Sequence, residues 1–572
     1  MANLVTSSSW PLYLEGHIET LSSSSWMVCI MLDVSDVLAN YRKQGWWRDQ
    51  TFLDDLRRHC AATPGKPALI GHQIHGAEPR TTVTDYAELT RLTDAFAARL
   101  VALGVRPGDV VAVQLPNCWE LLPLGLACAR AGAVFCPLMT VYRRRELEYI
   151  LRLTGARVCI TISEWGGVRL ADIVTALAAD LPEIEHVVVA GQDRPAGTLS
   201  FADYFLGAPS ADADELDGLA LGPDDPFLVL FTSGTTGESK GVLHSQNTLY
   251  ASCRAYSDIL KLDDGIVAFV AHATTHYSGF VVGMLVPLLL GGTAMVQDVW
   301  DAPAYLDAAA RHKVTTFYGA PNFLVDLLAV QRDEPRDVST LTSIVTGSAP
   351  IPPHLVEQVA AVYGVRVIAL WGMTENGAVT ITRLDDPPDW AQHSDGSPIP
   401  GMQVRIDTST VRGRSDGSGR LLVRGSSQCL GYFKRDEVYA KALDGDGWFD
   451  TGDLARDDGR GGIRLTGRVK DVVTHRGFNV PVGEVENALA LHPQVAEVAI
   501  IGLPDDRADE VVCAVVVPAG SPPSLDSLRE HLADAGFNEW FWPGRLEVLD
   551  VLPRTITGKV RKVDLRQRFG AG

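Results

Sequence analysis

The chain has 572 residues, 46% of them hydrophobic and 8% aromatic, which is typical of an ordered globular enzyme rather than a disordered chain. This length exceeds what a single hydrophobic core supports, so we expect two or three domains. The formal net charge of −20, from 50 basic and 70 acidic residues, argues against nucleic acid or an anionic membrane surface as the main partner.

The chain begins with a Ser-rich segment that has neither a basic n-region nor a small-residue cleavage site, so it does not resemble a signal peptide. We interpret residues 1–35 as a flexible extension and assign it no function. From there on, helical patterns alternate with short apolar strands, which indicates an α/β fold. Helices are predicted over Tyr86–Leu103 and Cys118–Ala133, and strands over Val110–Leu115, Val158–Ser163 and His186–Ala190.

The alternation resumes after an acidic surface connection at Ala208–Pro223. The further predicted strands are Pro226–Leu230, Ile266–Ala271, Thr293–Gln297, Thr315–Tyr318, Ser343–Thr346 and Val367–Leu370. Several end in polar, Gly-containing loops, and such loops form the ligand crevice of α/β sheets. The apolar stretch Phe280–Leu290 is too short to span a bilayer, so we interpret it as a buried helix. Beyond Gly401 the pattern becomes β-like, and from Val482 it indicates a compact α+β unit.

The stretch Phe231–Ser245, FTSGTTGESKGVLHS, combines Ser/Thr clusters with three glycines and one lysine. An apolar strand leads into it, and we expect a helix to begin near Val242. Such a loop offers backbone N–H groups, hydroxyls and the charge of Lys240 to an anion, which predicts a phosphate cradle. A flexible linker is disfavoured by the framing strand and helix. The P-loop of kinases is disfavoured because Gly-Glu-Ser-Lys-Gly breaks its G-x-x-x-x-G-K-[ST] pattern.

A second motif, Ile368–Gly377 (IALWGMTENG), ends a strand in an aromatic residue, a glycine, a hydroxyl and a carboxylate. Trp371 next to Gly372 suits stacking on a base. Thr374 and Glu375 suit phosphate and Mg²⁺, which prefers hard oxygen ligands. An ordinary strand end followed by an N-capping threonine accounts for the motif equally well.

Other polar motifs are less specific by themselves. Asp453 follows Thr-Gly in a tight loop and suits ribose hydroxyls, whereas an acidic turn with a solvated Arg468 is a fair alternative. The sequence GSAP at Gly347–Pro350 is compatible with an ordinary turn. Lys559, in a Gly/Thr turn near the end of the chain, and the lone His276 in HATTHYSGF would usually be solvent-facing and structural, respectively.

Six motifs in order along the chain together resemble those of the adenylate-forming enzymes, in the acyl-CoA synthetase branch: Phe231–Ser245, Gly347–Pro350, Ile368–Gly377, Gly447–Arg468, Lys470–Glu486 and Pro553–Arg561. The glycine-rich loop resembles [ST]-S-G-[ST]-T-G-x-P-K-G except at Ser239, where the family usually has proline. The resemblance implies a large N-terminal domain over residues 36–468, with α/β subdomains and a small β-barrel-like subdomain. It also implies a small mobile α+β domain over residues 469–572, which turns about a hinge at Lys470.

The resemblance further implies roles for individual residues. Lys559 is the main adenylation residue, Glu375 binds Mg²⁺, Thr374 holds phosphate, and His276 is a gate or carboxylate contact. The residues implied to bind the nucleotide are Thr232, Ser233, Gly234, Thr235, Thr236, Lys240, Ser348, Ala349, Pro350, Trp371, Gly372, Asp453 and Arg468. Those implied for the acyl pocket are His276, Tyr318, Gly319 and Ala320. Those implied for CoA are Gly477, His475 and Arg476, although the last two could equally be solvated.

The implied reaction joins a carboxylic acid to coenzyme A through an acyl-adenylate and uses ATP and Mg²⁺. The segments GWWRDQTFLDDL and WGMTENGAVT look most like those of ligases for alicyclic, aryl or medium-to-long acyl chains, such as cyclohexanecarboxylate-CoA ligase-like enzymes. Three alternatives stay open. One is an enzyme that performs only the thioesterification of a supplied acyl-adenylate, another is an acyl-AMP ligase that loads a carrier protein, and the third is a catalytically silent binding protein.

The cysteines bear on location. Nine are scattered along the chain without CxxC or Cys/His spacing, which suggests neither a zinc site nor a disulfide framework. We expect buried free thiols in a reducing cytoplasm, no membrane span, and small-molecule partners rather than nucleic acid. The sequence leaves the oligomeric state open, with a dimer as one option.

Overall fold

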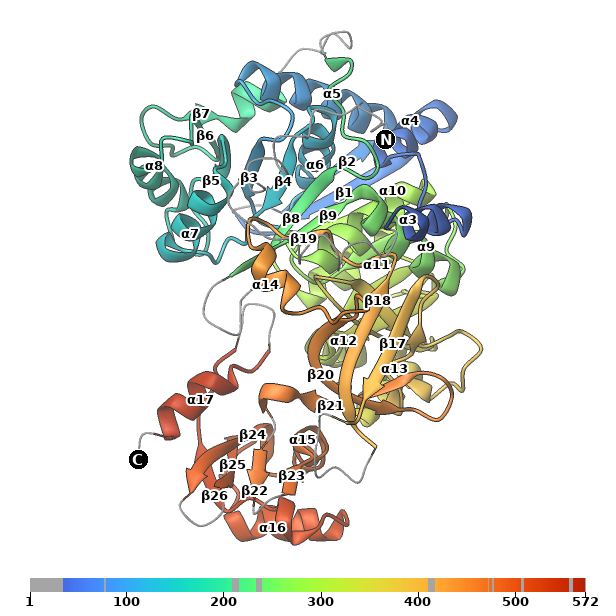
Figure 1. Cartoon of the computed structure of the whole chain (residues 1–572), viewed down its shortest axis with the longest axis vertical. Helices are drawn as coiled ribbons and strands as arrows, with labels where there is room; N and C mark the ends of the chain where they lie inside the picture. The colour runs from blue at the N-terminus through green and yellow to red at the C-terminus, as the bar shows by residue number, and fades with distance from the viewer. Residues whose placement is uncertain are drawn as a thin grey trace.

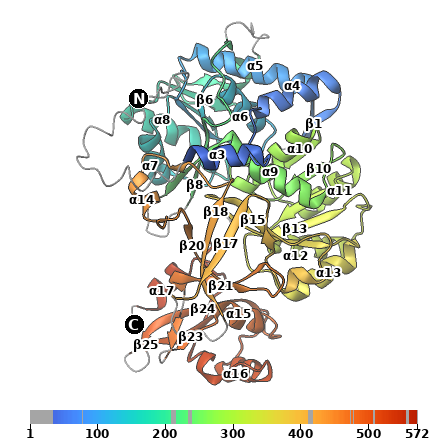
Figure 2. The same ribbon diagram turned by 45° about the vertical axis from the view of Figure 1, so that its right-hand side comes forward.

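The computed structural model describes residues 34–76, 79–207, 216–232, 239–409, 417–471, 473–475, 478–505, 509–554 and 559–570. The first of two α/β sheets lies in the upper part of the molecule in Figure 1, and the strands β17, β18, β20 and β21 lie lower, at the height of helices α12 and α13. The C-terminal elements gather at the opposite end from α5, as Figure 2 also shows. Among the described residues, every helix is too short or too polar to cross a bilayer.

The first sheet has eight strands in the order β19-β9-β8-β4-β3-β5-β6-β7. Its central strands are parallel, and they are almost continuously apolar because helices cover both faces. The strands are β3 (Val110–Gln114), β4 (Val134–Pro137), β5 (Val158–Ile162), β6 (His186–Ala190), β7 (Leu199–Ser200), β8 (Pro226–Thr232), β9 (Lys240–Ser245) and β19 (Gly431–Tyr432). The helices near it are α5 (Tyr86–Ala102), α6 (Leu121–Arg130), α7 (Arg144–Thr154), α8 (Leu170–Asp180) and α9 (Gln246–Leu260).

The second sheet has nine strands in the order β16-β15-β14-β13-β12-β10-β11-β1-β2. Its strands are β1 (Pro67–Gln73), β2 (Arg80–Asp85), β10 (Val267–Val270), β11 (Thr293–Gln297), β12 (Thr316–Gly319), β13 (Ser343–Gly347), β14 (Val367–Met373), β15 (Gly377–Ile381) and β16 (Ser397–Pro398). Its helices are the buried pair η4 (Ser278–Leu285) and α10 (Val286–Leu290), together with α11 (Ala302–His312), α12 (Pro321–Asp333) and α13 (Pro353–Tyr363). Strands β10, β12, β13 and β14 are parallel, so their carboxyl ends meet at one edge.

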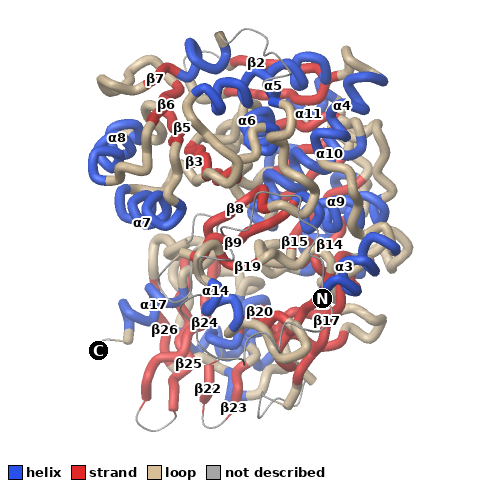
Figure 3. Tube along the Cα trace, turned by 45° about the horizontal axis from the view of Figure 1, so that its top comes forward, coloured by secondary structure: helices blue, strands red, loops and turns tan. Residues whose placement is uncertain are grey.

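Two smaller sheets complete the fold, and Figure 3 shows their strands below β9. One is antiparallel, with β17 (Met402–Asp407), β18 (Gly419–Gly425), β20 (Phe449–Asp457) and β21 (Ile463–Arg468). The other contains β22 (Val473–His475), β23 (Phe478–Val480), β24 (Val495–Asp505), β25 (Asp509–Pro518) and β26 (Arg545–Val548). The same unit contains helices α15 (Val482–Leu489), α16 (Leu525–Asp534) and α17 (Lys562–Phe569), and it has its own apolar clusters.

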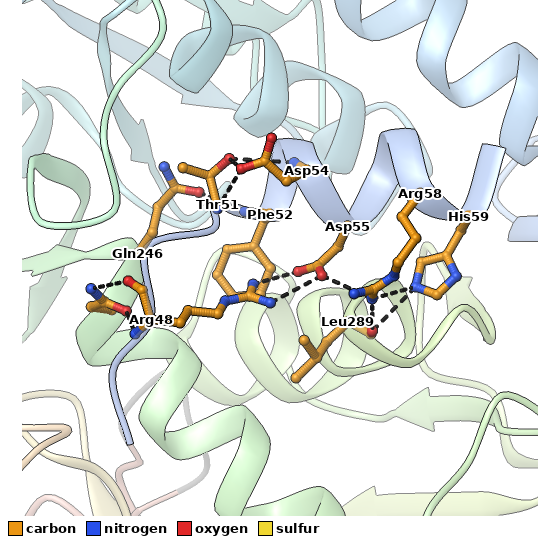
Figure 4. Close-up of polar contacts among 10 residues, drawn as sticks. Arg48, Thr51, Phe52, Asp54, Asp55, Arg58, His59, Gln246 and Leu289 are labelled. Carbon is orange, nitrogen blue, oxygen red and sulfur yellow. Dashed lines mark hydrogen bonds and ion pairs between the residues drawn. The ribbon is translucent and has the colours of Figure 1, made fainter. Parts of the chain in front are cut away.

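An ion-pair cluster attaches helix α4 (Phe52–Ala62), which follows α3 (Val34–Lys43), to neighbouring helices (Figure 4). Arg48 binds both carboxylate oxygens of the buried Asp55. The backbone of Arg48 exchanges hydrogen bonds with the Asn247 side chain on α9, and Arg58 donates to the carbonyl of Leu289 on α10. The cluster therefore ties α4 to two helices that are distant in sequence.

The predicted α/β fold with a small C-terminal α+β unit is confirmed, and the predicted strands lie within a few residues of the observed ones. The prediction that a helix begins near Val242 is wrong. Residues 240–245 form strand β9, which pairs with β8 and β19, and helix α9 begins only at Gln246. The Ser245 side chain caps that helix by accepting a hydrogen bond from the Thr248 N–H.

Candidate functional site

Asp453 joins two of the residues that sequence analysis assigned to the nucleotide. Its carboxylate accepts a hydrogen bond from the Trp371 indole (Nε1–Oδ2 3.2 Å) and pairs with the Arg468 guanidinium (Nε–Oδ1 3.0 Å). Asp453 lies opposite Arg468 on the paired strands β20 and β21, whereas Trp371 comes from β14. The turn before Asp453 needs glycine, because Gly452 has a φ of +72°. Three elements thus converge on one buried carboxylate.

The Thr374–Glu375 turn follows β14 and is held by a buried histidine. The carbonyl of Thr374 accepts a hydrogen bond from Nε2 of His244 (2.7 Å), and the Thr248 hydroxyl lies 2.9 Å from Nδ1. Burial lowers the pKa of His244 to about 4, so its imidazole is neutral at pH 7. Because a carbonyl only accepts, the ring proton must lie on Nε2. His244 is therefore a fixed donor that orients this turn.

Glu375 lies beside a tyrosine that sequence reasoning missed. The Tyr432 hydroxyl donates to Oε1 of Glu375 (2.9 Å), and Nζ of Lys240 lies 4.9 Å from the centre of the Tyr432 ring. Burial raises the pKa of Glu375, while Tyr432, Lys240 and Arg468 oppose that shift. Tyr432 thus brings the lysine of the glycine-rich loop and the proposed metal carboxylate to one place. A carboxylate of this kind has the hard oxygen that Mg²⁺ prefers.

Replacing Tyr432 with phenylalanine is expected to raise the Mg²⁺ concentration for half-maximal pyrophosphate release by about tenfold, since a hydrogen bond to a charged group is lost. The pKa of Glu375 should rise further, so the defect should grow as the pH is lowered. Tyr439→Phe is the matched control, because the Tyr439 hydroxyl contacts Cys429 and Gln428 instead. An unchanged Mg²⁺ dependence, or equal changes in both variants, would contradict this role.

Ser348 connects the nucleotide residues to the acyl residues. It follows β13 with a φ of +67°, a conformation that is strained for a residue with a side chain. Its side chain hydrogen-bonds Tyr318, whose pKa burial raises to about 12. Ala349 and Pro350 are exposed beside it, whereas Gly319 and Ala320, after Tyr318, are buried. The ends of β12 and β13 therefore adjoin, as expected for neighbouring parallel strands.

His276 and Lys559 interact although they come from distant parts of the chain. Burial and the charge of Lys559 lower the pKa of His276 to about 4. The same charge contributes to the lowered pKa of His272, at the end of β10. Nδ1 of His276 lies 3.0 Å from the Ser278 hydroxyl. Lys559 is exposed and comes directly before Val560, which forms an isolated β-bridge with Arg554.

Several predicted residues lie outside the described residues: Ser233, Gly234, Thr235, Thr236, Arg476, Gly477 and the side chain of Lys470. Thr232 ends strand β8, opposite Lys240 on β9. Gly372, next to Trp371, has no space for a side chain, because a Cβ there would lie 2.1 Å from the Gly377 carbonyl oxygen. His475 lies on β22, where its Nδ1 is 2.6 Å from the carbonyl of Glu510. The roles assigned to all these residues stay predictions.

Comparison with protein families identifies the fold. Residues 56–433 match the model of the AMP-binding enzymes, and residues 484–559 match the model of the AMP-binding enzyme C-terminal domain. The chain belongs to the AMP-binding enzyme family. The predicted membership of the adenylate-forming enzymes is therefore confirmed.

Relatives of this AMP-binding enzyme include ligases for different acids. It is 31% identical to the medium-chain fatty-acid–CoA ligase of Escherichia coli (strain K12), over 92% of each chain. It is 35% identical to the 3-[(3aS,4S,7aS)-7a-methyl-1,5-dioxo-octahydro-1H-inden-4-yl]propanoyl:CoA ligase of Rhodococcus jostii (strain RHA1), over 82% of this chain and 91% of the relative. Among solved structures, the anthranilate CoA ligase AuaEII in complex with anthranoyl-AMP has a TM-score of 0.80 at 26% identity, over 91% of this chain and 97% of that chain.

Proposed function

We propose that the protein is an AMP-forming acyl-CoA ligase for a bulky, non-peptidic carboxylic acid of the alicyclic, aryl or medium-to-long-chain class. The observation that supports this proposal is that burial and the charge of Lys559 lower the pKa of His276, because this couples the predicted adenylation residue to the predicted acyl site. The relatives support it, because their acids are a medium-chain fatty acid, a bicyclic propanoate and anthranilate. A cytoplasmic location is part of the same proposal.

In the first half-reaction, a carboxylate oxygen of the acid attacks the α-phosphorus of ATP. The bond to the bridging oxygen breaks, and pyrophosphate leaves. Lys559 would stabilise the charge that develops between carboxylate and α-phosphate, and Lys240 would hold the leaving phosphates. Asp453 would accept hydrogen bonds from the ribose. Glu375 would hold Mg²⁺, which when bound neutralises charge on the phosphate oxygens.

In the second half-reaction, the sulfur of CoA attacks the acyl carbon, the thiol proton passes to solvent water, and the bond to the AMP oxygen breaks so that AMP leaves. We propose that the unit after Lys470 turns to withdraw Lys559 and to bring the segment around His475 to the site. Arg566 on α17 donates to the Asp471 carboxylate (3.0 Å) next to the proposed hinge. Both residues follow Lys470, so this contact can turn with the unit. Neither step needs a nucleophilic side chain, since binding and electrostatics supply the catalysis.

A panel of carboxylic acids assayed separately for the two half-reactions tests the proposal. We expect ATP-dependent pyrophosphate release with at least one bulky acid and CoA-thioester formation from the matching synthetic acyl-AMP. Thioester formation without pyrophosphate release would identify an enzyme of the second step only. Transfer to a carrier protein but not to CoA would identify a carrier-loading ligase, and the absence of both activities would refute the proposed function.

A further inference from the structure

His272 is a buried imidazole with no hydrogen-bond partner for its ring among the described residues. It lies two residues beyond β10 and is only 6% exposed. Neither Nδ1 nor Nε2 has a partner. Buried polar side chains are nearly always hydrogen-bonded, because leaving one unpaired costs free energy. An unpaired donor and acceptor in one ring therefore requires an explanation.

The surroundings of His272 belong to the acyl site. Its ring meets Tyr318 edge to face at 5.1 Å between centroids and Phe323 edge to face at 5.7 Å, and His276 lies 6.1 Å away. The charge of Lys559 acts on His272 as it does on His276. His272 thus lies among the residues that the proposed function assigns to the acid, and its own nitrogens are not used by them.

Hydrogen bonds with the Asn117 side chain fix the backbone of the loop that carries His272. The Asn117 side chain accepts hydrogen bonds from the N–H (2.8 Å) and the hydroxyl (3.1 Å) of Thr274. The same amide donates to the carbonyl of His272 (3.5 Å). The backbone that carries the unpaired ring is therefore held in place, as expected for a preorganised ligand contact.

We infer that His272 is a specificity-determining residue that hydrogen-bonds an uncharged oxygen, a hydroxyl or a ketone, on the acid away from its carboxylate. This inference rests on the proposed function and narrows its substrate class. Phe323 is half-buried on the first turn of α12 and contacts the imidazole edge to face, so the inference requires Phe323 to move aside when the acid enters.

The charge state of His272 selects the kind of oxygen. Burial, His276 and Lys559 lower its pKa to about 3, so the ring is neutral at pH 7 and offers one donor and one acceptor. A hydroxyl can use both nitrogens in turn, and a ketone can use only the N–H. A second carboxylate fits poorly, because a neutral ring would leave its buried charge uncompensated.

The test compares matched acids in pyrophosphate release. Cyclohexanecarboxylate is paired with its hydroxy and oxo ring isomers, and benzoate with the hydroxybenzoates. We expect the wild-type protein to prefer at least one oxygen-bearing acid over its parent by about tenfold in kcat/KM. His272→Phe should remove this preference, so kcat/KM should fall about tenfold more for the oxygen-bearing acid than for its parent. His272→Gln, which keeps a donor and an acceptor, should retain part of the preference.

Each other outcome overturns the inference. If the wild-type protein shows no preference within any pair of acids, the inference is refuted, whether or not the variants fold. Equal losses on both members of a pair in His272→Phe would indicate a structural role only. A preference unchanged in His272→Phe would mean that the ring binds an ordered water only. If none of the acids supported pyrophosphate release, the proposed function would be refuted, and the inference with it.

Discussion

Replacing Lys559 with alanine is expected to lower pyrophosphate release by about 10²- to 10³-fold, the range seen when one preorganised electrostatic contact to a transition state is removed. Thioester formation from a synthetic acyl-AMP should change little, because the second half-reaction does not use this lysine in the proposed mechanism. The two half-reactions are measured separately, pyrophosphate by a coupled assay and the thioester by chromatography.

The physical reason lies in where the charge of Lys559 acts. It contributes to the lowered pKa of both His272 and His276, so the ammonium group and the acyl residues interact. A cation in this position stabilises the negative charge that grows on the carboxylate and α-phosphate as they react. Alanine removes the charge without adding bulk, and the ground state of the acid should be less affected than the transition state.

Arg561→Ala is the matched control for Lys559. Arg561 is also basic, lies two residues further along, and pairs on the surface with Asp564 at 3.1 Å. Losing that exposed pair should change neither half-reaction by more than about twofold. If Lys559→Ala slowed both half-reactions equally, or if Arg561→Ala had the same effect, the lysine would not be a specific adenylation residue.

The sequence predicted the site best where local patterns suffice. An apolar run followed by polar, glycine-containing residues marks the carboxyl end of a strand, and parallel strands bring such ends to one edge. Trp371 lies at the end of β14, and Ser348 and His276 follow β13 and β10, as this pattern expects. Their roles were implied by the family resemblance and stay predictions. The contact between Ser348 and Tyr318 agrees with that reasoning.

Contacts between distant strands could not be predicted. The segment KGVLHS is too short to distinguish a strand from the start of a helix by periodicity. Its pairing with β8 and β19 makes it a strand, and alternate residues then share a face, including Lys240 and His244. Placing the helix too early hid His244, and no local signal connects Tyr432 to Glu375. Likewise, the unpaired nitrogens of His272 are a property of the packed structure.

The N-terminal ion-pair cluster leads to the largest expected effect on stability (Figure 4). Asp55→Ala is expected to lower the free energy of unfolding by about 3–5 kcal/mol, the cost of leaving one member of a buried ion pair without its partner. The side chain of Asp55 is 1% exposed and that of Arg48 is 13% exposed, so water would not replace the lost carboxylate. Urea unfolding compared between variants measures the change.

Asp54→Ala is the control on the same helix. Asp54 belongs to the capping box with Thr51, and its side chain is 44% exposed, so its loss should cost only about 1 kcal/mol. Equal destabilisation by the two alanine substitutions would show that the burial of Asp55 is unimportant. The comparison keeps the chemical change constant and varies only the surroundings.

A double variant separates the buried charge from the volume of the side chains. Arg48→Met combined with Asp55→Leu removes both charges and keeps apolar contacts with α9 and α10, so it should recover most of the stability lost in Asp55→Ala.

Arg58 also pairs with Asp55, at 2.9 Å, but its side chain is 57% exposed and can be solvated in the double variant. Burial raises the pKa of Asp55, although Arg48 acts to lower it. The free-energy cost of desolvating the Asp55 carboxylate is therefore larger than its attraction to Arg48. If the double variant were as unstable as Asp55→Ala, the pair would contribute through its specific geometry rather than through the avoidance of an unpaired buried arginine.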